Sequence, residues 1–152
     1  MSTLKVGDKA PDFTLPTGSG GRFSLKDVKG KKVVIYFYPK DDTSGCTKEA
    51  CSFRDNTKII QKKGAVIIGA SIDSVESHKK FASKYDLPFT LVSDEEKDLV
   101  KKYGVWKEKN MYGRKYMGIV RTTFVINEKG VISHIFPKVN VEGHIDEILA
   151  LL

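Results

Sequence analysis

The sequence lacks the features that mark a membrane protein or a secreted disulfide scaffold. It contains no run of 18 apolar residues, so we expect no segment to span a membrane. Its first residues, MSTLKVGDKAPDF, have no apolar core of the kind that a secretory signal needs, which favours a cytoplasmic location. Only two cysteines occur in 152 residues. In a reducing compartment such a pair is more often catalytic, redox-active or metal-binding than structural.

Arginine is also scarce, although the formal net charge is +7. The basic charge comes mostly from lysines that are scattered along the chain, usually with acidic residues nearby. A dedicated phosphate-binding surface would often use more arginines, because the guanidinium group binds phosphate through two hydrogen bonds. We therefore expect solvated helix faces and strand ends, and no nucleic-acid partner.

The pattern of apolar residues predicts strands that alternate with helices. Strands are expected over 31–39, 65–73, 89–94, 121–127 and 131–136, and helices over 43–63, 74–85, 95–103 and 144–152. The glycine-rich segment 16–23 joins two short strands and lacks the Lys-Ser/Thr pair of a phosphate loop. This order predicts one α/β domain over 1–152 with a mixed central β-sheet flanked by helices, an N-terminal β-hairpin extension and a thioredoxin-like arrangement.

Both cysteines, Cys46 and Cys51, lie in the first expected helix. Cys46 opens an inward stripe whose members recur at spacings of 4, 3, 4 and 3; the others are Ala50, Phe53, Thr57 and Ile60. It falls in the first turn, where unpaired backbone N–H groups and the helix dipole favour a thiolate over a thiol. We therefore predict that Cys46 is a nucleophile. The alternative is a small buried hydrophobic residue.

Cys51 has a different geometry. Five residues along a helix rotate the side chain by about 140° net and separate the two Cα atoms by ~8.7 Å. A disulfide usually needs Cα atoms within about 6.8 Å. Either the two cysteines are unrelated and Cys51 is a partly exposed bystander, or the helix must unwind locally to bring them together.

The histidines do not favour a metal site. His78, His134 and His144 fall on separate elements, and none has a neighbouring ligand, whereas a zinc site would need further His or Cys ligands at short spacing. We expect His78 and His144 on helix surfaces or near helix starts, and His134 on the same side of its strand as Ile132 and Phe136. The cysteine spacing is also too long for the C-x-x-C motif of a general disulfide reductase.

The segment YFYPKDDTSGCTKEACSFRD resembles the active-site segment of the peroxiredoxins, which are cysteine-dependent peroxidases. Pro39, Thr43 and Cys46 match the family pattern Pro-x-x-x-Thr-x-x-Cys, and a second cysteine five residues later is similar to the PrxQ, or bacterioferritin comigratory protein, subgroup. GIVRTTFVIN resembles the segment that supplies the active-site arginine, here Arg121. The resemblance covers about 6–149. One departure is Ser44, where many relatives have proline, which implies a less rigid loop.

This resemblance implies a peroxidase that needs no metal, haem or nucleotide cofactor. The Cys46 thiolate would attack hydrogen peroxide or an organic hydroperoxide and become a sulfenic acid. Thr43 would hydrogen-bond the thiolate or the peroxide, Arg121 would add positive charge, and Pro39 would shield the thiol from water. Glu49 would orient Arg121 or Thr43, or else is a plain solvated acid.

The resemblance further implies that Cys51 resolves the sulfenic acid into an intrachain Cys46–Cys51 disulfide. A dithiol partner, thioredoxin or a similar protein, would then reduce the disulfide in an antioxidant cycle. Because no other cysteine exists, we expect no intersubunit disulfide, and hence a monomer.

Two other functions stay open at this point. The first is a basic binding module or chaperone with incidental cysteines, since aromatic and basic residues interleave between 106 and 116 and could bind a single strand of nucleic acid. These residues are Trp106, Lys107, Lys109, Tyr112, Arg114, Lys115 and Tyr116. The second is another thiol enzyme on the same scaffold, such as a disulfide isomerase.

Overall fold

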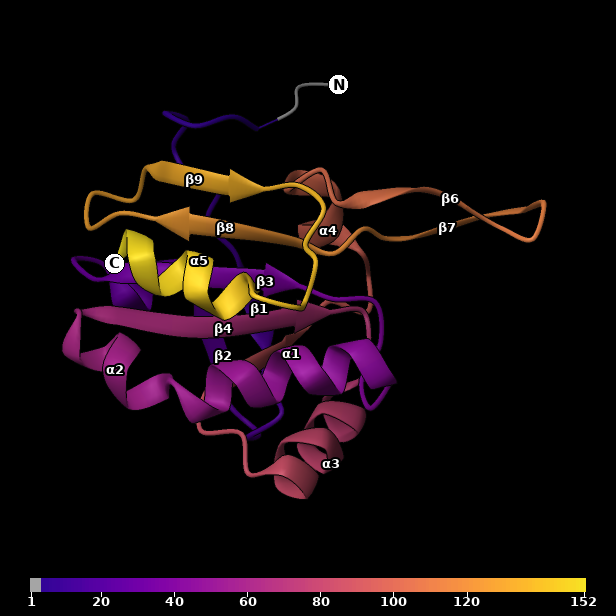
Figure 1. Ribbon diagram of the computed structural model, residues 1–152, viewed down its shortest axis with the longest axis horizontal. Coiled ribbons are helices and arrows are strands. Elements are labelled where there is room, and N and C mark those ends of the chain that lie inside the picture. The colour runs from indigo at the N-terminus through magenta and orange to yellow at the C-terminus, as the bar shows by residue number, and fades with distance from the viewer. Residues whose placement is uncertain (1–3) are drawn as a thin grey trace.

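A central five-stranded sheet sets the position of every other element (Figure 1). This computed structural model describes residues 4–152, so the first three residues of the domain expected over 1–152 lie outside it. In spatial order the strands are β5 (Thr90–Ser93), β4 (Ala65–Ser71), β3 (Lys32–Phe37), β8 (Thr122–Ile126) and β9 (Ile132–Phe136). β3, β4 and β5 run parallel, whereas β8 and β9 are antiparallel to their neighbours. The mixed sheet expected from the sequence is confirmed.

The central strand β3 divides the core into two apolar clusters, one on each face of the sheet. Successive side chains of a strand point to opposite faces. One face of β3 therefore packs Val33, Ile35 and Phe37 into the first cluster. The other face packs Val34 and Tyr36 into the second. All five side chains are buried, which explains why this segment reads as a continuous apolar run.

Helices cover the second cluster and shorter elements cover the first. The second cluster receives side chains from α1 (Ser44–Asp55), α2 (Thr57–Lys62), α3 (Val75–Tyr85) and α5 (His144–Leu151). The first receives them from β2 (Arg22–Ser24), the 3-10 helix η1 (Leu25–Val28) and α4 (Asp98–Lys102). β2 pairs antiparallel with β1 (Thr14–Pro16), which confirms the expected N-terminal hairpin. Within residues 4–152, no helix combines the length and apolar character needed to cross a bilayer.

The single helix expected over 43–63 is wrong, because the chain breaks at Asn56 into α1 and α2. The Asn56 side-chain amide donates to the Ser52 carbonyl at 2.8 Å, and the Thr57 hydroxyl donates to the Phe53 carbonyl at 2.9 Å. Side chains that bond backbone carbonyls in this way compete with the regular helical ladder. The inward stripe nevertheless continues across the break, since Cys46, Ala50, Phe53, Thr57 and Ile60 are all buried.

The helix expected over 95–103 is shorter than predicted and spans Asp98–Lys102. Lys97 has a φ of 64°, which no regular helix contains, so the helix starts after it. Asp94 lies before this turn and its carboxylate accepts from the backbone N–H groups of Leu99 and Val100 at 3.2 and 2.9 Å. The Asp94 carboxylate, which lies outside the helix, thus supplies hydrogen-bond acceptors for backbone N–H groups in the first turn of α4.

The segment between α4 and β8, for which the apolar pattern predicted neither a strand nor a helix, forms a second hairpin. β6 (Trp106–Met111) pairs antiparallel with β7 (Arg114–Ile119), and Figure 1 shows this hairpin extending away from the central sheet. Its two turn residues, Tyr112 and Gly113, both have positive φ, at 54° and 77°. Such a pair matches the right-handed twist of the strands that it joins.

The histidines lie deeper than the sequence suggested. We expected His78 and His144 on helix surfaces or near helix starts. Both lie near a helix start, but both side chains are buried and neither is on a helix surface. The placement of His134 on the same side as Ile132 is wrong, whereas its placement on the same side as Phe136 is confirmed by the register of β9 with β8. A bulge opposite Val125 shifts the register, so that Ile132 packs in the first cluster and Phe136 against the second, while His134 is exposed.

Candidate active site

Cys46 lies in the first turn of α1 with its side chain 1% exposed. The helix begins there because Thr43 is extended, with φ −91° and ψ 157°, and its carbonyl accepts from the Thr47 N–H at 2.8 Å. The first N–H groups of a helix have no intrahelical acceptor, so they and the helix dipole favour negative charge at this end. Cys46 therefore lies in the first turn of its helix, as the sequence predicted.

Arg121 and Glu49 form an ion pair directly beside the thiol. One guanidinium nitrogen of Arg121, Nη2, donates to Cys46 Sγ at 3.3 Å, and the other, Nη1, donates to Glu49 Oε1 at 2.6 Å. Arg121 reaches the site because it precedes β8, which pairs with β3 just before the start of α1. A Cβ atom on Gly45 would lie 3.2 Å from Arg121 Nη2, so a larger residue there would crowd the guanidinium.

Burial gives this pair unusual acid–base properties. Glu49 is 2% exposed and its second carboxylate oxygen has no hydrogen-bond partner. Burial raises the pKa of Glu49 to about 7, although Arg121 pulls it in the opposite direction. Burial alone would lower the pKa of Arg121, but Glu49 and Cys46 outweigh it, so the pKa of Arg121 is raised. The guanidinium therefore stays positively charged beside the sulfur at any physiological pH.

Thr43 and Pro39 lie in the loop that leads into α1, but neither contacts Cys46 by a hydrogen bond. The Thr43 hydroxyl donates to the Lys40 carbonyl at 2.8 Å and not to the sulfur, which differs from the expected contact. The reason is local, because the extended Thr43 places its side chain on the preceding turn of the loop. Pro39 is partly buried and follows the end of β3.

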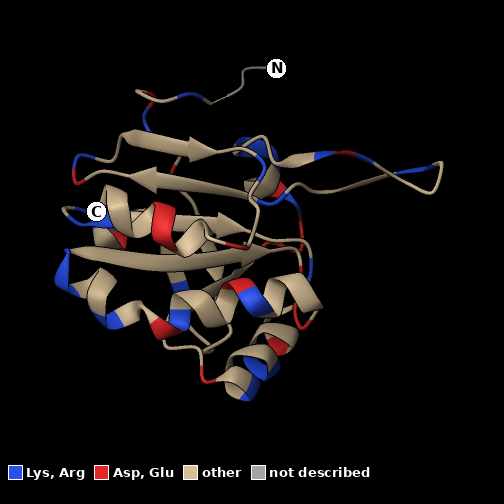
Figure 2. Cartoon of the chain, viewed as in Figure 1, with Lys and Arg blue, Asp and Glu red and all other residues tan. Residues whose placement is uncertain are grey.

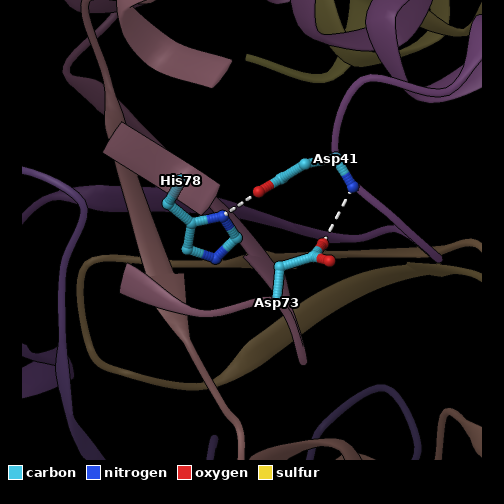
Figure 3. Close-up of side chains that lie close together, drawn as sticks. All are labelled: Asp41, Asp73 and His78. Carbon is cyan, nitrogen blue, oxygen red and sulfur yellow. Dashed lines mark hydrogen bonds and ion pairs between the residues drawn. The ribbon is translucent and has the colours of Figure 1, made fainter. Parts of the chain in front are cut away.

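A buried network that the sequence did not reveal anchors this loop (Figure 3). Asp41 accepts from the Tyr38 hydroxyl at 2.5 Å and the Ser77 hydroxyl at 2.8 Å, and its carboxylate lies 2.7 Å from His78 Nδ1. His78 Nε2 donates to the Val92 carbonyl at 2.8 Å. The network ties the loop before Cys46 to α3 and β5.

Asp41, Asp73 and His78 are also the one group among the described residues whose ligand atoms are close enough to hold a metal ion. Each of these three side chains already has a protein hydrogen-bond partner. Asp73 Oδ2 accepts from the Asp41 N–H at 2.8 Å and from the Ser71 hydroxyl at 2.6 Å. These contacts describe a hydrogen-bond network that shapes the loop.

Cys51 lies on α1 as well, and both cysteines are free thiols. It is partly exposed, in contrast to the buried Cys46, as the net rotation of about 140° requires. The helix is continuous from Ser44 to Asp55, so the Cα separation of ~8.7 Å expected for a regular helix applies. The two sulfurs cannot be joined in this conformation.

Lys109 is a further charged group at the site that the sequence did not single out for the chemistry. Its Nζ donates to the Ile119 carbonyl at 2.7 Å, two residues before Arg121. Burial lowers the pKa of Lys109, as does Arg121, while Cys46 acts in the opposite direction. A Cβ atom on Gly118 would lie 3.0 Å from Lys109 Cδ, so the glycine leaves room for this side chain.

Comparisons with known proteins support the resemblance to the peroxiredoxins. The AhpC/TSA family profile matches residues 6–135. Peroxiredoxin Bcp of Bacillus subtilis is 47% identical over 150 residues, which cover 99% of this chain and 96% of that protein. A relative in Coxiella burnetii is 56% identical over 150 residues, or 99% of each chain.

Solved structures show the same relationship in three dimensions. The structure of Xylella fastidiosa PrxQ superposes with a TM-score of 0.94 at 34% identity, covering 99% of this chain and 96% of that one. The bacterioferritin comigratory protein of Xanthomonas campestris, studied for its alkyl peroxide reduction activity, gives a TM-score of 0.87 at 42% identity over 91% and 88% of the two chains. The expected thioredoxin-like fold is confirmed, and the chain belongs to the AhpC/TSA family as a peroxiredoxin of the Bcp/PrxQ type.

Proposed function

We propose that this peroxiredoxin reduces hydrogen peroxide and organic hydroperoxides through a sulfenic acid on Cys46. The thiolate attacks one peroxide oxygen, the O–O bond breaks, and the leaving oxygen takes up a proton and departs as water or an alcohol. The sulfur is thereby oxidised by two electrons. The observation that carries this proposal is the 3.3 Å contact between Arg121 and Cys46 Sγ at the start of α1.

The neighbouring residues then have distinct tasks. Arg121 stabilises the thiolate and the negative charge that develops on the leaving oxygen. Glu49 is a positioning residue, because its 2.6 Å bond to Nη1 directs the other guanidinium nitrogen towards the sulfur. Thr43 donates to the bound peroxide once its hydroxyl turns away from the Lys40 carbonyl, and Pro39 limits the access of water to Cys46.

Cys51 resolves the oxidised enzyme. Its thiol attacks the Cys46 sulfenic acid, a disulfide forms and one water molecule leaves. The first turns of α1 must unwind for this step, because the helical geometry keeps the sulfurs apart. Ser44 and Gly45 at the start of α1 make unwinding easier, since glycine in a helix is less favourable than alanine by about 1 kcal/mol.

A dithiol protein of the thioredoxin type then returns both cysteines to thiols and becomes oxidised itself. This cycle requires a reducing compartment such as the cytoplasm. It needs no metal, other cofactor or nucleic acid, and no second subunit supplies a residue to it, so a monomer suffices.

The proposal is tested by treating the reduced protein with one equivalent of hydrogen peroxide and recording its mass. We expect a loss of two hydrogens that maps to a Cys46–Cys51 bridge, and no such change in Cys46→Ser. A chain that leaves peroxide unconsumed would falsify the proposal. So would an oxidised structure in which the bridge forms while α1 remains fully wound.

A further inference from the structure

The β6–β7 hairpin concentrates exposed apolar side chains to an extent not seen elsewhere in residues 4–152. Seven large hydrophobic side chains are exposed within residues 4–152, and four of them lie on the hairpin or its turn. They are Met111 at 54%, Tyr112 at 100%, Tyr116 at 41% and Met117 at 51%. Two of these four, Met111 and Tyr116, lie on the same face of the hairpin, and exposed apolar side chains that gather on one face mark an interaction site more often than isolated ones.

The same hairpin is basic. Its strands and turn carry four cations and a single acid, Glu108, and Figure 2 shows blue segments along both strands. Lys107, Arg114 and Lys115 are exposed. A surface of this charge attracts a partner of opposite charge and accelerates its association.

One face of the hairpin leads from the active thiol to the tip. Residues opposite each other in an antiparallel pair share a face, and the register pairs Lys109 with Tyr116 and Met111 with Arg114. Lys107 lies on this face too, because it is two residues from Lys109. We call these five residues the docking face.

The two ends of the docking face differ in character. At the inner end, Lys109 bonds the Ile119 carbonyl and its charge is felt by both Arg121 and Cys46. At the outer end, Met111, Arg114 and Tyr116 line a hollow together with the turn residue Tyr112. Because β6 has six residues, the face is about 20 Å long, which suits a patch of a protein surface better than a small peroxide.

We propose that the docking face binds the acidic dithiol protein that reduces the Cys46–Cys51 disulfide. This inference rests on the proposed function. One thiolate of the partner attacks a sulfur of the bridge to give a mixed disulfide, and its second thiol releases the partner in oxidised form. Two electrons and two protons pass to Cys46 and Cys51, which become thiols again. The partner's cysteines lie at the inner end of the face while its acidic surface contacts Arg114 and Lys107.

The chain offers a matched pair of variants for the test. Arg114→Glu and Lys115→Glu change the net charge equally and concern adjacent exposed residues, but only Arg114 lies on the docking face. Met111→Ser removes apolar surface from the same face without a change of charge. Turnover is measured with a thioredoxin, kept reduced by thioredoxin reductase and NADPH, and separately with dithiothreitol, which is too small to need the face.

We expect Arg114→Glu to lower kcat/KM for thioredoxin roughly tenfold, equivalent to about 1.4 kcal/mol. Met111→Ser should lower it in the same direction, and Lys115→Glu should change it much less. Added salt should reduce the difference between wild type and Arg114→Glu, since ions screen exposed charges. Turnover with dithiothreitol and KM for peroxide should be the same in all four proteins.

Four results would overturn the inference. The first is an equal loss of kcat/KM for thioredoxin in Arg114→Glu and Lys115→Glu, and the second is unchanged thioredoxin kinetics in all variants. The third is a KM for organic hydroperoxide that is raised in Arg114→Glu or Met111→Ser when dithiothreitol is the reductant. The fourth is binding of the wild type to vesicles of anionic phospholipid that Arg114→Glu abolishes while thioredoxin kinetics stay normal. The third would assign the face to the substrate and the fourth to a lipid surface. Failure of the proposed function is distinguishable, because wild type would then show no turnover even with dithiothreitol.

Discussion

Replacing Glu49 with glutamine should change how the stability of the fold depends on pH. The wild-type carboxyl is 2% exposed, one of its oxygens has no partner, and burial raises its pKa from the ordinary 4.5 to about 7. In the folded protein the group therefore keeps its proton up to about pH 7, whereas in the unfolded chain it loses the proton near pH 4.5. Between these values the folded state binds more protons, so stability falls as pH rises.

The size of the effect follows from the two pKa values. A rise from 4.5 to about 7 corresponds to about 3 kcal/mol of stability that is fully present below pH 4.5 and lost as pH rises through 7. Glutamine has nearly the same shape and does not titrate. The free energy of unfolding of wild type relative to Glu49→Gln should therefore decrease by about 3 kcal/mol as pH rises over this range, whatever pH-independent offset the change from carboxyl to amide adds.

Urea unfolding of both proteins at several pH values measures this difference directly. Glu142→Gln is the matched control, because Glu142 pairs with Lys48 on the surface and is mostly exposed. Exposed ion pairs contribute little, so this variant should follow the wild-type pH dependence closely. Parallel curves for wild type and Glu49→Gln would refute the assignment of a neutral Glu49 at mildly acidic pH, and with it the role of burial at this site.

Three further changes test the site. Arg121→Met should slow the oxidation of Cys46 by peroxide roughly 10²-fold in stopped-flow experiments, by analogy with removal of one transition-state donor; an unchanged rate would argue against its role. Cys51→Ser should consume one equivalent of peroxide and then stop cycling with thioredoxin, and continued turnover would mean that an external thiol resolves the sulfenic acid. Gly118→Ala should displace the Lys109 side chain and break the hydrogen bond from Lys109 to the Ile119 carbonyl, which should reduce stability by about 1 kcal/mol and lower the urea midpoint. An unchanged midpoint would mean that Lys109 adapts without cost.

Periodicity predicted the elements that pack against the core. β3 and β4 were readable because strands buried on both faces are apolar throughout. The stripe from Cys46 to Ile60 was readable because one helical face meets the sheet. The break at Asn56 was not predictable from the apolar pattern. It depends on side-chain hydrogen bonds to backbone carbonyls, and these bonds leave the apolar pattern unchanged. The β6–β7 hairpin was not predicted, because most of its side chains are exposed and neither face is consistently apolar.

The site was predictable where a local rule or a family motif applies. Cys46 followed from its place at a helix start, and Arg121 from the resemblance alone, because the two residues are 75 positions apart and meet only through strand pairing. The link between Asp41 and His78 spans 37 positions and joins a loop to a helix, so no periodic signal reveals it. The burial of Glu49 likewise depends on the elements around α1, which explains why a solvated acid remained an alternative.

The discontinuity at Asn56 limits how far a conformational change in α1 can spread. Helical order is cooperative along an unbroken ladder of hydrogen bonds, and a fresh ladder starts in α2 with the Ile60 N–H bonded to the Asn56 carbonyl. α2 can therefore keep Ile60 in the core while the turns around Cys46 come apart. In the proposed cycle only a stretch of 12 residues has to be metastable, and the sheet beneath it can stay folded while that stretch opens.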